Sequence, residues 1–97
     1  MNNITPGAVQ AIAYHNQQAD EAHRRAMAHL DVYNQAMVRL QEALAATDGQ
    51  AAELAEVQAD TAWTNMNTLL QIGYQHRNSA AIAAGMAAEI GNDGRKS

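Results

Sequence analysis

Apolar and small residues recur along the chain at alternating intervals of three and four residues. One series starts just after Pro6 and a second starts just after Gly49. Such intervals place side chains on one face of an α-helix, as in a coiled coil. The spacing predicts a helix over about residues 6–46 and another over about residues 50–90, with a polar tail at 91–97. The first series consists of Val9, Ile12, Asn16, Ala19, His23, Ala26, Leu30, Tyr33, Met37, Leu40 and Leu44.

The larger side chains of the two series gather near the middle of the chain. The first series is small or polar as far as Ala26 and bulky from Leu30 onward. The apolar face of the second helix is wider, which is typical of a helix that packs against two neighbours. Trp63 is interpreted either as an anchor of the fold or as an exposed hot spot for a partner. The residues predicted to pack within or between chains are Leu30, Tyr33, Met37, Leu40, Leu44, Leu54, Val57, Trp63, Met66 and Leu69.

The two helical patterns are separated by a turn at Thr47, Asp48 and Gly49. Thr47 is followed three residues later by Gln50, which fits a capping box: the hydroxyl accepts a hydrogen bond from a backbone amide of the second helix, and Gln50 reaches back. Gly49 is either a left-handed residue of the turn or part of the first turn of the second helix. A connection this short predicts an antiparallel hairpin.

The predicted fold is all-α, with residues 1–97 forming a single helical-hairpin domain. Alanine supplies much of the 47% hydrophobic fraction, whereas aromatic residues supply only 4%. Alanine favours helix but buries little area, so the composition indicates long helices in close contact rather than a thick core. A hairpin of this size buries less surface than a compact domain of equal mass. We therefore expect two hairpins to pair into a four-helix bundle, as a homodimer or a heterodimer.

Charge and composition exclude several classes of partner. Ten acidic against six basic residues give a net charge of −4, and no basic stripe is present that would neutralise a nucleic-acid backbone. The chain contains no cysteine, which excludes disulfides and thiolate chemistry. No run of about 18 apolar residues occurs, and the opening residues lack a basic segment followed by an apolar one. We expect no nucleic-acid binding, no membrane span and no general secretory signal.

The sequence shows no arrangement typical of catalysis or of a cofactor. His15, His23, His29 and His76 form no i, i+4 pair, and no Glu-x-x-His motif occurs. His23 is interpreted as a packing residue, whereas His15 and His29 are expected to be exposed. Asn16 is either a buried amide that fixes the helix register or a solvated residue. Because no nucleophile can be combined with a base and no phosphate loop is present, no catalytic, cofactor-binding or metal-binding residues are predicted.

Several short stretches are spaced as in a known family. They are Ile4-Thr5-Pro6-Gly7-Ala8-Val9, the central turn, Gly49-Gln50-Ala51-Ala52 with Leu54, and Met66-Asn67-Thr68-Leu69-Leu70. This layout resembles the small WxG-type, early-secreted-antigen-like substrates of type VII secretion systems. The resemblance implies a non-enzymatic hairpin that pairs with itself or with a paralogous hairpin, and a secretion ATPase as a further partner. It also implies secretion by a route independent of a signal peptide, with the protein cytoplasmic before export.

Two motifs of that family are not retained. Thr47-Asp48-Gly49 replaces the Trp-x-Gly turn, and Tyr74, which would need an acidic residue four positions later for the export signal, is followed by Asn78. In heterodimeric members, the two chains can supply these motifs to each other. The chain is therefore interpreted as an exported substrate, a secretion partner or a relative that is not exported. The alternative is a structural helical subunit of a phage or other large assembly, whose apolar faces are covered by repeating neighbours.

Overall fold

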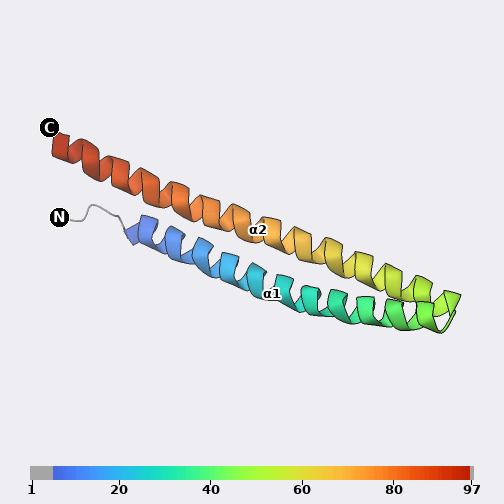
Figure 1. The fold of residues 1–97 in the computed structure, drawn as a ribbon. Helices are drawn as coiled ribbons and strands as arrows, with labels where there is room; N and C mark the ends of the chain where they lie inside the picture. The colour runs from blue at the N-terminus through green and yellow to red at the C-terminus, as the bar shows by residue number, and fades with distance from the viewer. Residues whose placement is uncertain (1–5, 97) are drawn as a thin grey trace. The chain divides into compact units, whose positions relative to one another are not determined.

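The chain consists of two long α-helices joined by a short turn (Figure 1). The computed structural model describes the backbone of residues 6–96 and the side chains of residues 6–85. Helix α1 spans Pro6–Ala45 and helix α2 spans Gly49–Lys96. Pro6 suits the first position of α1, where its missing amide costs no intrahelical hydrogen bond. No strand occurs in residues 6–96, and the predicted all-α helical hairpin is confirmed.

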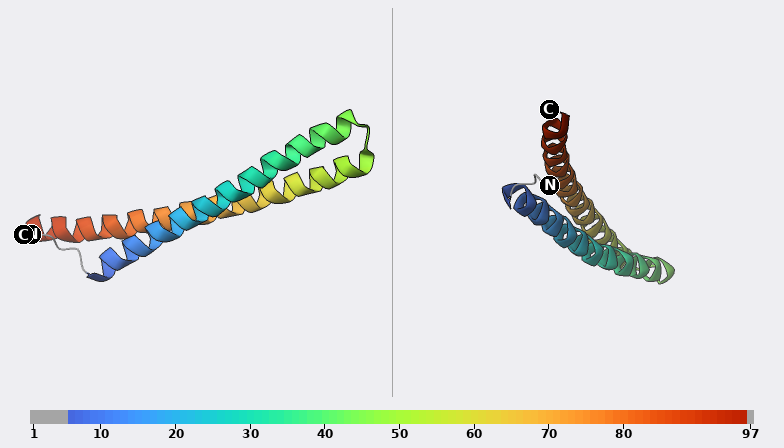
Figure 2. Two further views of the ribbon diagram at one scale, coloured as in Figure 1. Left: turned by 90° about the horizontal axis from the view of Figure 1, so that it is seen from below. Right: turned by 90° about the vertical axis from the view of Figure 1, so that its left-hand side faces the viewer.

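The two helices contribute to two compact units, each made of one segment of α1 and one segment of α2. The turn unit is Ala22–Gln71, and the terminal unit consists of the described residues of Met1–Glu21 and Ile72–Ser97. In the turn unit, α1 and α2 run side by side in opposite directions away from the turn, as the views in Figures 1 and 2 agree.

Small side chains fill most of the contact between the two helices of the turn unit. The buried positions and most of the half-buried ones follow alternating intervals of three and four residues on both helices. Alanine at these positions allows close approach, because the distance between helix axes depends on the side chains at the contact. The heptad core of the turn unit consists of Ala22, Ala26, His29, Tyr33, Ala36, Leu40 and Ala43 of α1 and Ala52, Ala55, Ala59, Ala62, Met66 and Leu69 of α2.

The terminal unit is built on the same spacing. Its buried and half-buried positions again combine small residues with a few larger ones, and each helix contributes one histidine to them. The heptad core of the terminal unit consists of Ala8, Ile12, His15 and Ala19 of α1 and Gly73, His76, Ala80 and Ala83 of α2. The polar histidine side chains therefore lie where a coiled coil ordinarily places apolar ones.

The packing positions predicted on α1 are correct at every second residue. Ala19 and Ala26 lie in the core, whereas the predicted positions between the correct ones are exposed, as at Val9 and His23, or only half-buried. At each of those exposed or half-buried positions, the preceding residue lies in the core instead. Two sets of positions with alternating spacings of three and four share every second residue and differ by one position in between. The prediction chose the set with the larger side chains, but helices that approach closely accommodate only the smaller ones. The prediction that His23 packs is therefore wrong, and Asn16 is solvated.

The turn combines a Schellman C-cap on α1 with an aspartate N-cap on α2. The Asp48 amide donates to the Ala43 carbonyl at 2.9 Å, and the Thr47 amide donates to the Leu44 carbonyl at 3.2 Å; these are the two bonds of a Schellman motif. Thr47 is left-handed, with φ of 55°. The Ala51 amide donates to Asp48 Oδ1 at 3.1 Å, so the Asp48 carboxylate caps α2.

The predicted roles of the turn residues are therefore shifted by one position. Thr47 and Gln50 do not form the predicted capping box, because Asp48 occupies the N-cap and the third helical residue is Ala51. Gly49 is the first residue of α2 and has no positive φ. It is therefore part of the first turn of the second helix rather than a left-handed residue. Aspartate suits the N-cap because its carboxylate accepts an amide hydrogen bond and its charge is favourable beside the positive end of the helix dipole.

Helix α2 extends further than the sequence predicts. It reaches Lys96, whereas the predicted end lies near residue 90. Gly91 and Gly94 fall within it. Glycine lowers helix propensity by about 1 kcal/mol but, unlike proline, keeps its backbone donor, so it weakens a helix without ending it. Ile4 and Thr5, which open the first stretch of the family resemblance, lie outside the described residues.

Loss of the N-cap should destabilise the fold. In Asp48→Ala the Ala51 amide loses its side-chain acceptor, and the free energy of unfolding is expected to fall by about 1 kcal/mol. Urea unfolding monitored by circular dichroism measures this difference. Asp60→Ala is the control, because Asp60 is an exposed residue in the interior of α2; an equal loss in both variants would contradict the capping role.

Replacing the left-handed threonine should have the opposite effect. A left-handed conformation costs an L-residue about 1–2 kcal/mol, and glycine relieves this cost while losing about 0.5–1 kcal/mol to its greater freedom in the unfolded chain. Thr47→Gly is therefore expected to raise the free energy of unfolding by up to about 1 kcal/mol. The matched control is Thr68→Gly in the exposed interior of α2, which should lower it; destabilisation by both would contradict strain at Thr47.

Candidate interaction surface

Several large apolar side chains lie outside the alanine core and face solvent. Leu44, Leu54 and Val57 are 63%, 60% and 62% exposed. Exposed apolar side chains that gather in one region mark interaction sites, whereas scattered ones do not. The exposed large hydrophobic residues of the turn unit are Met27, Val32, Val38, Leu44, Leu54, Val57, Trp63 and Leu70.

Two neighbouring grooves run between α1 and α2 in the turn unit. The first has a volume of about 470 Å³ and is lined in part by Val32 and Val57. The second has a volume of about 350 Å³, is lined in part by Leu54, and extends to the turn. Arg39 and Gln58 line both grooves. These five residues, Val32, Arg39, Leu54, Val57 and Gln58, form the groove face.

A hydrogen bond between the two helices crosses the groove face. Arg39 Nη1 donates to Gln58 Oε1 at 3.1 Å. An exposed bond of this kind adds little to stability, but it holds a guanidinium among apolar side chains. Arginine within an apolar patch is typical of protein interfaces. A partner that covers Leu54 and Val57 therefore needs an acceptor, such as a carboxylate, opposite Arg39.

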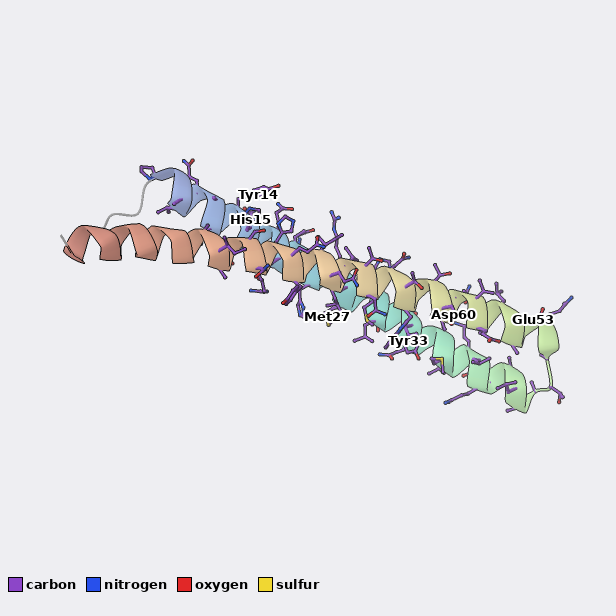
Figure 3. All side chains as sticks on the ribbon, turned by 90° about the horizontal axis from the view of Figure 1, so that it is seen from above. Tyr14, His15, Met27, Tyr33, Glu53 and Asp60 are labelled. Carbon is purple, nitrogen blue, oxygen red and sulfur yellow. The ribbon has the colours of Figure 1, made fainter. Side chains whose placement is uncertain are left out.

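Trp63 both packs within the hairpin and remains accessible. Its ring lies 5.1 Å from the ring of Tyr33, centroid to centroid, with the two planes at 49°; Figure 3 labels Tyr33 on α1. Such an aromatic pair contributes about 0.5–1.5 kcal/mol beyond the area that it buries. Trp63 is nevertheless 47% exposed. The Tyr33 contact supports the anchoring interpretation, and the exposed part of the indole is still open to a partner.

An acidic face on α2 bounds the apolar surface. Glu53, Glu56 and Asp60 are exposed, and their intervals of three and four residues place them on one side of the helix. Figure 3 labels Glu53 and Asp60 on this helix. Burying three carboxylates without partners would be costly. Since Val57 lies four residues after Glu53 and three before Asp60, a partner that covers Val57 must offer donors to these carboxylates.

In the terminal unit, two histidines meet between the helices. His15 of α1 and His76 of α2 are half-buried, with their Nδ1 atoms 2.8 Å apart. The ring of Tyr14 lies edge-on to both, with centroid distances of 5.3 Å to His15 and 6.2 Å to His76; Figure 3 labels Tyr14 and His15 together on α1. His15 is thus not the exposed residue that the sequence predicts, and neither is His29, which is half-buried in the heptad core of the turn unit. Local spacing could not reveal this pair, because 61 residues separate its members.

Other chemistry is sparse in the described part of the chain. Within residues 6–85, no group of three or more histidine, cysteine or acidic side chains is placed to hold a metal ion. No polar or charged side chain is fully buried among those residues. Across the described helices, no segment is long and apolar enough to span a membrane. The groove face and the histidine pair are therefore the two candidate sites in the part of the chain whose side chains are described.

The residues predicted to pack fall into three groups. Tyr33, Leu40, Met66 and Leu69 lie in the heptad core, Leu30 and Met37 are half-buried beside it, and Leu44, Leu54, Val57 and Trp63 are exposed. The sequence reading did not single out buried alanines such as Ala36 and Ala55, although their regular spacing with other alanines is a usable signal. Packing of the exposed group between chains stays a prediction.

In comparisons with known proteins, no family model, no curated protein and no solved structure matches the chain. The resemblance to type VII secretion substrates rests on the motifs and spacing within this sequence.

Proposed function

We propose that this chain is a non-enzymatic helical-hairpin protein that pairs with a second hairpin, another copy or a paralogous chain. In this proposal, it acts as an exported substrate or as a secretion partner of a type VII secretion system. The observation that carries the pairing is the position of bulky apolar side chains outside an alanine core. Leu54 and Val57 of the groove face are the clearest examples, since each lines a groove between helices while remaining mostly exposed.

The exposed area of the chain supports a partner. The chain exposes 7024 Å², whereas a globular monomer of 10.4 kDa is expected to expose about 5,400 Å². The excess of about 1,600 Å² exceeds the roughly 800 Å² that each partner buries in an interface of standard size. Pairing with a second hairpin would cover such an area by packing long helices nearly parallel or antiparallel to one another, as in a four-helix bundle.

The choice of secretion system rests on the resemblance together with the hairpin. Members of the family are small hairpins that pair, and the short turn at Thr47 and Asp48 joins two helices of that kind. The chain lacks the Trp-x-Gly turn and the tyrosine export signal. A paralogous hairpin that bears both motifs is therefore the favoured partner for export.

The pairing is tested by size-exclusion chromatography with light scattering on the full chain over a range of micromolar concentrations. A mass of twice 10.4 kDa is expected for a homodimer. If the chain alone is monomeric, co-expression with a small hairpin protein encoded beside it should yield a stable one-to-one complex. A well-folded monomer that binds no such neighbour would contradict the proposal.

Export is tested separately from pairing. The chain, co-expressed with its partner hairpin, should accumulate in the culture medium of cells that have an intact secretion ATPase and remain inside cells in which that ATPase is deleted. The alternative function, a structural subunit of a large assembly, predicts open-ended oligomers or filaments by electron microscopy. Its support is that exposed large apolar residues lie on both helices, and a closed dimer would contradict it.

A further inference from the structure

We propose that His15 and His76 of the terminal unit form a binding site for a Zn²⁺ ion. The two side chains come from different helices, and both are half-buried in the contact between them. Their Nδ1 atoms face each other at 2.8 Å. The proposal is independent of pairing and export, because both ligands belong to one chain.

The separation of the two rings suits a tetrahedral ion. A zinc–nitrogen bond is about 2.0–2.1 Å long, which places two ligand nitrogens about 3.3 Å apart at the tetrahedral angle. With the ring centre about 1.1 Å behind each nitrogen, the two centroids would lie about 5.2 Å apart. The observed centroid distance is 5.1 Å, with the ring planes tilted by 35°. The ion can therefore enter when the imidazoles turn and their Nδ1 atoms separate by about 0.5 Å, with no change in the spacing of the helices.

The protonation of the pair is compatible with this exchange. In the hydrogen bond, one Nδ1–H donates and the other Nδ1 accepts through its lone pair, so the two rings, when both are neutral, are different tautomers. Zinc needs a lone pair on both Nδ1 atoms. The donating ring therefore moves its proton to Nε2, and neutral imidazole is the form that zinc binds. The hydrogen bond is replaced by two metal–nitrogen bonds without a net loss of protons.

The surroundings hold the two ligands but leave the ion open to solvent. The aromatic ring of Tyr14 packs edge-on against both imidazoles, which restricts their motion. The Asp20 carboxylate is engaged by a cation instead, since its Oδ1 accepts from Arg77 Nη2 at 2.9 Å. Water would fill the other two positions of a tetrahedral ion, which leaves this site one protein ligand fewer than a catalytic zinc site.

Isothermal titration calorimetry of the full chain with ZnCl₂ tests the site. One ion per chain is expected, and both His15→Gln and His76→Gln should weaken binding by at least about tenfold, because even outer-shell partners of metal ligands are worth roughly 10–100-fold. His23→Gln is the matched control, since His23 is exposed on the same helix as His15, and it should bind zinc as the original chain does. Circular dichroism establishes that each variant remains helical.

A second measurement keeps the test decisive where a variant loses its helices. In ¹H–¹⁵N spectra of the original chain, added zinc should shift the ring nitrogens of His15 and His76 and leave those of His23 unchanged. Saturable shifts confined to the pair support the site. Three results would overturn it: unchanged affinity in His15→Gln, equal losses in all three variants, or ring nitrogens of the pair that do not respond because the two histidines form a hydrogen bond only.

Discussion

Replacing Leu54 and Val57 together by aspartate is expected to leave a folded hairpin that no longer pairs. Both side chains lie outside the heptad core, so the contacts between α1 and α2 do not depend on them. Burying one leucine or valine side chain contributes about 1.5–3 kcal/mol. Since Leu54 and Val57 are 60% and 62% exposed, loss of both from an interface should weaken association by at least about 1.8 kcal/mol, which is about twentyfold in Kd. Sedimentation equilibrium measures this change.

The control for this double variant adds the same charge elsewhere on α2. Asn67→Asp combined with Gln71→Glu introduces two carboxylates at exposed positions. Asn67 and Gln71 lie ten and fourteen residues beyond Val57, and neither lines one of the two grooves. This variant should retain the Kd of the original chain. Equal weakening in both double variants would show that added charge, rather than loss of the groove face, disrupts pairing, and the groove face would then be excluded as the interface.

The second large effect is expected from Ala36→Leu. Ala36 is 0% exposed and lies in the heptad core, where small side chains allow the two helices to approach closely. A leucine there must displace α2 or adopt an unfavourable rotamer, and overpacking of this kind costs about 1–3 kcal/mol. For a domain of this size, the expected fall in Tm is about 4–8 °C for each kcal/mol. Thermal unfolding followed by circular dichroism measures it.

Ala28→Leu distinguishes overpacking from a change in helix propensity. Ala28 is an exposed residue of the same helix, and alanine and leucine are both strong helix formers. The substitution should therefore change the free energy of unfolding by less than about 0.5 kcal/mol. If Ala36→Leu were as stable as Ala28→Leu, the contact between α1 and α2 would accommodate larger side chains. Close approach of the helices would then not explain why the leucines of the turn unit are exposed.

The candidate surface was only partly predictable from the sequence. Leu54 and Val57 are recognisable as large apolar residues of a wide helical face, which is why pairing between chains could be expected. Their exposure depends on which residues occupy the contact with α1, and those are the alanines. Trp63 illustrates the same limit: its spacing predicts a packing role, but only the position of Tyr33 shows which ring it contacts within the chain.

The sequence by itself determined the all-α hairpin and the approximate position of its turn. These are local properties: helix propensity, the spacing of apolar residues and the break around Asp48 act over a few residues at a time. Only the tertiary structure decided that alanines rather than leucines occupy most of the core, and that His15 meets His76. Both depend on how closely two helices approach and on their relative register, which are set by contacts between segments far apart in the chain.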